Sequence, residues 1–206
     1  MRARAAVVAI GLTLAGLGIA SDARADDDPD ADHTLPFYVP SQAKLQFAGN
    51  VGLLAVGGGW TWFHRTLDLD LLYGWVPPLQ GDESIHIGTL KVTVWPIEID
   101  LGDDWLLRPL SAGGVASLTF GDDYWIVQPD RYPDDYYPFS TALRFGAFVG
   151  GSFGRRFPHS TVKHLDVYWE AGVTDIELWL FLENPHHLTF WDVLHVALGV
   201  SVGFES

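Results

Sequence analysis

Residues Leu194 to Phe204 alternate between two kinds of side chain. One set is large and apolar, and the other consists of a histidine, glycines, alanine and serine. A period of two places the two sets on opposite faces of an extended strand. The second face is small and nearly uncharged, unlike the water-facing side of most soluble sheets. This pattern is typical of a narrow barrel whose bulky side chains face lipid while small ones crowd the lumen.

The same alternation recurs along the chain and predicts an all-β, antiparallel, up-and-down transmembrane barrel of about eight strands. With 194–204, seven segments show it; the other six are 45–63, 67–76, 87–95, 110–120, 143–153 and 165–174. The pattern in 45–63 slips once, which indicates a β-bulge near Gly57. Residues 176–182 also alternate and could form an eighth strand, extend the strand before them or form a short helix. Parity favours eight, because single-chain outer-membrane barrels have even strand numbers.

The N-terminus has the composition of a cleavable signal peptide over 1–25. Arg2 and Arg4 precede an apolar run, which ends at the small-residue site Ala23-Arg24-Ala25. We predict cleavage after Ala25, a disordered acidic spacer over 26–40 and a barrel domain over 41–206. The chain has no cysteine, which excludes a lipid anchor on cysteine, disulfides and thiolate metal sites.

Removing residues 1–25 leaves 9 basic and 25 acidic residues, a formal charge of −16. Nucleic acid is therefore excluded as a partner, because phosphate recognition needs clustered Lys and Arg. The hydrophobic fraction is nevertheless 48% and the mean hydropathy is +0.13. We infer that charge is confined to loops and a lumen while the outside is largely apolar.

Two further features favour lipid outside the barrel rather than water. Aromatic residues gather near the predicted strand ends, as in interfacial girdles; they are Trp60, Trp62, Phe63, Tyr73, Trp75, Trp95, Phe120 and Trp125. Phe204 lies within an amphipathic final strand and resembles the C-terminal signal that delivers barrels to the barrel-assembly machinery. Outer-membrane lipid and that machinery are the predicted partners, and the outer membrane is the predicted location.

The alternation also predicts charged side chains inside the barrel. An isolated buried charge is expensive, so these groups must pair or meet water. We expect a salt-bridge network that plugs the lumen, with a functional ion path or catalytic pocket as the alternative. Its predicted members are Asp68, Asp70, Lys91, Arg144, Asp166, Glu170 and His195.

Residues 121–141 form the segment richest in Pro, Asp and Tyr, which indicates an ordered loop. Its candidate interaction residues, for a sugar or lipid headgroup, are Asp130, Arg131, Tyr132, Tyr136, Tyr137 and Ser140. The motif Gly-Asp-x-Tyr-Trp, followed by Pro-Asp-Arg-Tyr-Pro-x-x-Tyr-Tyr-x-Phe-Ser-Thr, resembles a family of uncharacterised bacterial outer-membrane β-barrel proteins. The resemblance implies a barrel and a membrane, and no reaction.

The sequence thus predicts an outer-membrane barrel with a structural or surface-interaction role. Two alternatives stay open. A lipid-modifying enzyme, an acyl hydrolase or acyltransferase, would require a serine or aspartate beside a histidine at the outer rim. A soluble periplasmic lipid-binding barrel would require the aliphatic faces to enclose an apolar cavity. No cofactor and no metal site is predicted, since His186 and His187 lack a third ligand nearby.

Overall fold

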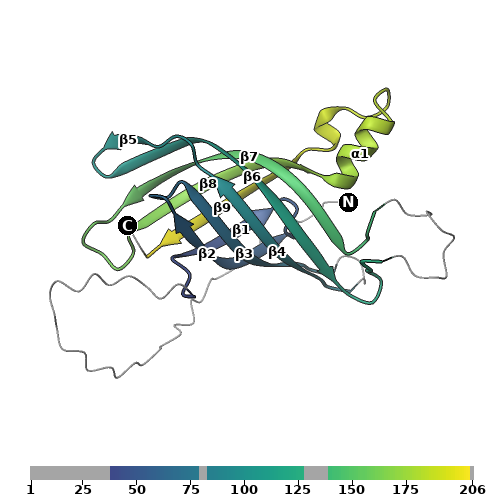
Figure 1. Ribbon diagram of the computed structural model, residues 1–206, viewed down its shortest axis with the longest axis horizontal. Coiled ribbons are helices and arrows are strands. Elements are labelled where there is room, and N and C mark those ends of the chain that lie inside the picture. Colours follow the sequence, from purple (N-terminus) through teal and green to yellow (C-terminus); the bar gives the residue numbers. More distant parts are fainter. Residues whose placement is uncertain (1–37, 79–82, 128–138, 205–206) are drawn as a thin grey trace, which may run out of the picture. The chain divides into compact units, whose positions relative to one another are not determined.

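A computed structural model describes residues 38–78, 83–127 and 139–204 (Figure 1). The predicted signal peptide 1–25 and most of the predicted spacer 26–40 lie outside these residues. The elements are β1 (Gln42–Ala48), β2 (Leu54–Trp62), β3 (Leu67–Val76), β4 (Ile85–Val94), β5 (Ile99–Gly102), β6 (Trp105–Phe120), β7 (Leu143–Arg156), β8 (His164–Thr174), α1 (Asp175–Glu183), the 3₁₀ helix η1 (Phe190–Asp192) and β9 (His195–Gly203).

The predicted eight-stranded antiparallel barrel is confirmed. The strands follow the order β4-β3-β2-β1-β9-β8-β7-β6-β5, and an additional antiparallel pairing of β4 with β6 closes the sheet. Eight strands form the closed wall. The ninth, β5, pairs only with the start of β6, where Ile99 lies opposite Leu107.

Two predicted segments fold differently from the expectation. Residues 45–63 are not one bulged strand, because a tight turn at 49–53 divides them into β1 and β2. Ala48 and Gly49 have φ values of 62° and 74° there, and the Ala48 N–H donates to the Leu53 carbonyl at 2.9 Å. Residues 176–182 form part of the helix α1, which was one of the three alternatives, and not the eighth strand that parity favoured. The eighth strand therefore comes from the first segment.

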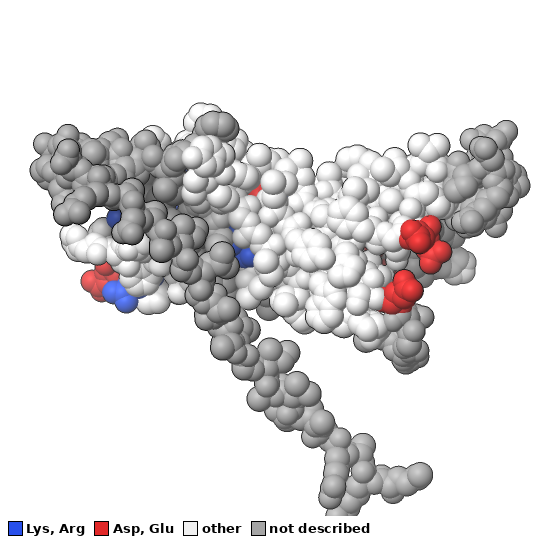
Figure 2. Space-filling model, turned by 90° about the horizontal axis from the view of Figure 1, so that it is seen from below, with Lys and Arg blue, Asp and Glu red and all other residues white. Residues whose placement is uncertain are grey.

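Most of the large apolar side chains of the strands point outward, whereas a few, such as Leu72, Leu106 and Phe148, are buried. In β9, Val196 and Leu198 are exposed while Ala197 and Ser201 are buried. Within the eight barrel strands, all of which the structure describes, the outward positions carry a single Lys, Arg, Asp or Glu, namely Arg155 near the end of β7. Figure 2 shows most of the surface that is not grey as white, with the largest charged patches toward the two ends and small blue and red patches between them.

The lumen is filled because bulky inward residues of one strand lie beside small residues of its neighbours. Tyr168 of β8 is opposite Gly199 of β9 and Ser152 of β7. A Cβ at Gly199 would lie 2.2 Å from the Tyr168 ring, so this position has room for no side chain. The small residues that the sequence pattern places on the inner face leave the space that the large β8 side chains occupy.

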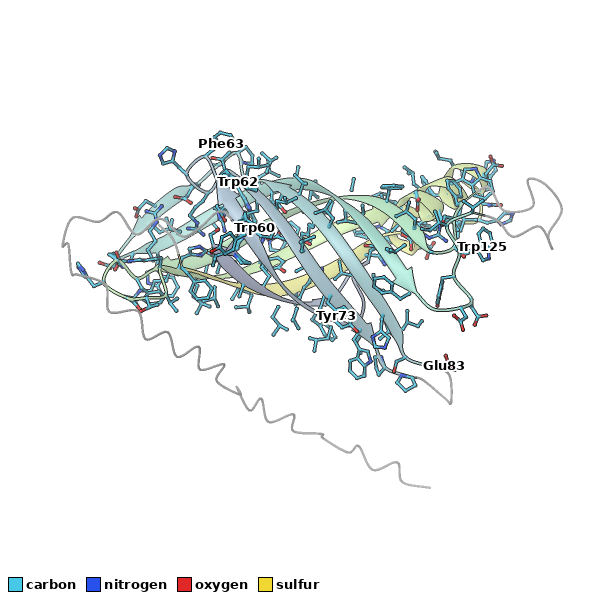
Figure 3. The ribbon with its side chains drawn as sticks, turned by 60° about the horizontal axis from the view of Figure 1, so that its bottom comes forward. Trp60, Trp62, Phe63, Tyr73, Glu83 and Trp125 are labelled. Carbon is cyan, nitrogen blue, oxygen red and sulfur yellow. The ribbon has the colours of Figure 1, made fainter. Side chains whose placement is uncertain are left out.

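The two ends of the barrel differ. One end, called the terminal end below, has the start of β1, the end of β9 and the connections 63–66, 95–104 and 157–163. The other, the loop end, has the connections 49–53, 77–84, 121–142 and 175–194. Exposed aromatic residues lie at both ends: Trp62 and Phe63 at the terminal end, and Tyr73 toward the loop end (Figure 3). Trp95 departs from the predicted girdle, because it is buried inside the barrel.

Candidate functional site

The lumen contains a buried lysine of β1 between two aspartates of β3. Lys44 Nζ lies 3.2 Å from Asp68 Oδ2 and 2.7 Å from Asp70 Oδ2. Gln42 Nε2 donates to Asp70 Oδ1 at 3.0 Å, and the Trp95 indole donates to Asp68 at 3.0 Å. The inward position of Trp95 thus supplies a donor that a buried carboxylate requires.

A second ion pair, nearer the loop end, joins Lys91 of β4 to Glu170 of β8. Lys91 Nζ also donates to Gln46 Oε1 at 3.0 Å, and the Tyr168 hydroxyl donates to the same oxygen at 3.1 Å. The ammonium lies 5.0 Å from the ring centroids of both Phe148 and Tyr168. Charge, hydrogen bonds and cation–π contacts together compensate the loss of water around this lysine.

A third group surrounds Asp166 toward the terminal end. Its Oδ2 accepts from Arg65 at 2.6 Å and Arg108 at 3.3 Å, and His164 Nδ1 lies 2.7 Å away. Arg108 also donates to Ser152 Oγ at 3.0 Å and stacks 4.0 Å from the Trp95 ring centroid. This arginine therefore links the group around Asp166 to the one around Lys44.

Across the described residues, the three groups bring four cations together with four carboxylates, so the formal charges cancel apart from His164. The carboxylates are the predicted Asp68, Asp70, Asp166 and Glu170, and the cations are Lys44, Arg65, Lys91 and Arg108. Sequence reasoning missed Lys44, because it precedes the predicted first segment 45–63, whereas β1 begins at Gln42. It missed Arg108, which precedes the predicted strand start, and Arg65, which lies in a turn without a periodic signal.

Arg144 and His195 are separate from this network, in contrast to the prediction. Both line an open hollow of about 630 Å³ at the loop end. Arg144 donates to the Ser140 carbonyl, and His195 Nε2 pairs with Glu177 Oε1 of α1. The alternation along β7 and β9 does direct the side chains of Arg144 and His195 toward the barrel axis. Their positions at the strand ends nevertheless place them at the mouth, where connecting segments supply partners.

Ser140 closes the base of the long loop between β6 and β7. Its hydroxyl donates to the Trp125 carbonyl at 2.8 Å and accepts the N–H groups of Ala142 and Leu143 at 3.2 and 2.9 Å. This serine therefore ties the two ends of the loop together. The other loop candidates, Asp130, Arg131, Tyr132, Tyr136 and Tyr137, lie outside the described residues.

Glu177 anchors α1 to the barrel wall. Its Oε2 accepts from the backbone N–H of Thr174 at 3.1 Å and from the Thr174 hydroxyl at 2.7 Å, while Oε1 meets His195 of β9. Further along the same connection, the backbone N–H and hydroxyl of Thr189 both donate to Asp192 and lower the pKa of its carboxyl. The carboxylates of Glu177 and Asp192 thus fix the local backbone of the connection 175–194, which borders the hollow at the loop end.

The substitution Glu177→Ala is expected to loosen α1 by about 1 kcal/mol, because the helix loses its N-terminal capping interaction and its link to His195. The barrel wall does not depend on these contacts and should keep its stability. Limited proteolysis of the folded protein in detergent would measure the effect as faster cleavage within residues 175–194. Glu183→Ala, which removes the same charge from the last turn of α1, is the matched control. Equal cleavage rates in the two variants would contradict the anchoring role.

The contacts of His164 and His195 point to structural pairing. His164 contacts Asp166 and Arg65, while His195 contacts Glu177. Within the described residues, no cluster of three or more His, Asp or Glu side chains is arranged to hold a metal ion. None of the described helices is long and apolar enough to cross a membrane.

These observations define the class of the protein as a closed, eight-stranded antiparallel β-barrel with an ion-paired lumen and an apolar exterior. Comparison of the chain with protein-family models, with curated proteins and with solved structures found no match in any of the three. The resemblance of the 121–141 motif to uncharacterised outer-membrane barrels therefore stays a prediction.

Proposed function

We propose that this protein is an outer-membrane β-barrel with a plugged lumen that presents its loop end to the surroundings in a structural or surface-interaction role. The observation that carries the proposal is the chemistry of the outward faces. A water-exposed sheet surface would not present this many adjacent Leu, Val, Phe and Trp side chains, because monomeric soluble proteins rarely expose apolar patches beyond a few hundred Å².

The dimensions of the strands support the same proposal. A transmembrane β-strand needs about 9–11 tilted residues. Five of the barrel strands fall in this range: β2, β3, β4, β8 and β9 have 9, 10, 10, 11 and 9 residues. The exposed aromatic residues at the two ends would then lie at the two interfaces.

The loop lengths support an orientation. Outer-membrane barrels have short periplasmic turns and longer extracellular loops. The terminal end, whose connections 63–66, 95–104 and 157–163 have four, ten and seven residues, would face the periplasm. The loop end, with 121–142 and 175–194, would face outward. Phe204, whose N–H donates to the Ser41 carbonyl at 2.8 Å, would then follow the last strand on the periplasmic side, where the assembly machinery would meet it.

The lumen supports a plug rather than a pore. Side chains fill the interior of an eight-stranded barrel, and here they form ion pairs whose charges cancel. The two alternatives from the sequence have less support. The aliphatic faces of the described strands point outward, and the lumen that these strands surround holds the ion pairs. Ser140 uses its hydroxyl to close a loop, and His164 and His195 pair with Asp166 and Glu177.

Cell fractionation combined with heat-modifiable gel mobility tests the location. We expect the full chain, expressed in a bacterium, in the outer-membrane fraction, with a mobility that changes on boiling because the closed barrel resists unfolding in detergent at room temperature. In planar lipid bilayers the purified protein should give no steady conductance. Recovery as soluble periplasmic protein without a mobility shift would contradict the membrane proposal, and steady ion current would contradict the plug.

A further inference from the structure

A second hollow, of about 430 Å³, lies at the terminal end. Three cationic side chains line it, together with one carboxylate, Glu98, and with His64, Pro158 and His164. Arg65 reaches it from the β2–β3 turn, Arg156 from the end of β7, and Lys163 from the residue before β8. The mature chain that we predict has a formal charge of −16 with only nine basic residues. Three of these nine basic residues line this one hollow, which concentrates positive charge there.

The carboxylates nearby leave part of this positive charge uncompensated. Glu98 pairs with Arg156, and Asp100 Oδ2 lies 3.8 Å from it. One guanidinium nitrogen of Arg65, Nη2, pairs with Asp166 Oδ2, and Arg108 and His164 contact the same oxygen. The other nitrogen, Nη1, is buried without a hydrogen-bond partner, with Glu98 Oε2 at 4.0 Å.

Lys163 adds a third cation with little compensation. Its ammonium has the Pro158 carbonyl as an acceptor, at the long distance of 3.5 Å. A buried guanidinium nitrogen without an acceptor and a weakly bonded ammonium are both groups for which a further acceptor is favourable. The hollow thus has unused donors on two of its sides.

The backbone that presents Arg65 is strained. Phe63, His64 and Arg65 have φ values of 54°, 54° and 65°, a left-handed conformation that is unfavourable for residues with a Cβ. The turn is closed by the Thr66 N–H, which donates to the Trp62 carbonyl at 3.1 Å. Such strain persists where the surroundings over-determine it, and here it holds Arg65 against Asp166 and at the edge of the hollow.

We propose that this hollow binds a phosphate-bearing anion, either the headgroup of an anionic phospholipid or a small phosphate ester. Arginine and lysine donors converging from three elements suit the several oxygens of a phosphate group. The exposed Trp62 and Phe63 line an adjoining hollow of about 130 Å³ that also contains Arg65. Aromatic residues at headgroup level next to cations match the surroundings of a lipid headgroup.

Binding measurements on the full protein in a non-ionic detergent test the proposal. The probes are inorganic phosphate and glycerol 3-phosphate by calorimetry, and phosphatidylglycerol by native mass spectrometry. The test variant is the double substitution Arg156→Gln and Lys163→Gln, which leaves the buried Arg65 network intact. The matched control is Arg155→Gln, because Arg155 neighbours Arg156 but stacks outward over the Trp105 and Phe157 rings, 5.5 and 5.8 Å from their centroids.

We expect saturable one-to-one binding of at least one probe to the wild-type chain and to Arg155→Gln, and binding weaker by about tenfold or more in the double variant. Binding of phosphatidylglycerol alone would assign the site to lipid, and equal binding of glycerol 3-phosphate would assign it to small phosphate esters. Absence of saturable binding for all three probes, or equal weakening in Arg155→Gln and the double variant, would overturn the proposal. A far-UV circular dichroism spectrum equal to that of the wild type shows that each variant is folded. The test needs no membrane, so its failure is distinguishable from failure of the proposed location.

Discussion

Replacing Lys91 by methionine is expected to destabilise the barrel by about 3–5 kcal/mol, the usual cost of breaking a buried ion pair by removing one partner. The Lys91 side chain is only 1% exposed and the Glu170 side chain 8%, so solvent cannot replace the lost ammonium. Methionine keeps nearly the same length, which makes the change mainly one of charge. Gln46 also loses a donor to its Oε1. Urea unfolding in lipid vesicles, followed by tryptophan fluorescence, would measure the loss.

The double variant Lys91→Met with Glu170→Gln is the matched control for this experiment. It removes both charges and should recover most of the lost stability, because an uncompensated buried carboxylate causes most of the defect. A Lys91→Met variant within about 1 kcal/mol of the wild type would mean that water reaches this part of the lumen. A double variant no more stable than the single one would mean that packing, rather than charge, explains the loss.

Replacing Leu71 by arginine is expected to cost about 2–4 kcal/mol if the barrel wall faces lipid, the range for a cation on the lipid face near the bilayer midplane. Leu71 lies in the middle of β3, opposite Gly58 of β2 and Leu90 of β4, and is 51% exposed. In water, such an exposed substitution changes stability by about 0.5 kcal/mol or less. The two environments therefore predict clearly different results for one substitution.

The amount of folded protein in the outer-membrane fraction and the urea midpoint in vesicles would both report the Leu71→Arg effect. Val127→Arg is the control, because Val127 is also apolar and is 80% exposed but lies in the loop beyond β6. It should remain close to the wild type in either environment. Equal stability of both variants and the wild type would contradict a lipid-facing wall.

The helix α1 shows where alternation misleads. Ile176, Leu178, Leu180 and Leu182 alternate with other residues, which a strand also requires, and none of the helix residues is buried. Thr174 and Glu177 form a capping box, a sequence signal for a helix start that the sequence analysis did not use. It outweighs the alternation because the segment lies beyond the wall, where no neighbouring strand can pair with it.

The hairpin of β1 and β2 shows a second error, in which two strands were predicted as one segment. The polar inward residues Gln42, Lys44 and Gln46 alternate with outward Ala43, Leu45 and Phe47, but the turn at 49–53 is so short that β1 and β2 looked like one strand. Only pairing reveals the division, since Leu45 lies opposite Val56 in the same hairpin. The prediction of a bulge near Gly57 was therefore wrong, although the glycines do lie in a strand.

Period-two alternation by itself determined that the chain forms strands with one bulky apolar face and one small or polar face, because neighbouring side chains of any extended backbone point to opposite sides. This local geometry was enough to predict a barrel and to place Asp68, Asp70, Lys91, Asp166 and Glu170 on the inner face. Only the tertiary structure decided which charges meet. Lys91 and Glu170 are 79 positions apart and Arg65 and Asp166 are 101 apart. Their pairing depends on strand register and on the closure of β4 against β6, which are set by the whole wall rather than by any one segment.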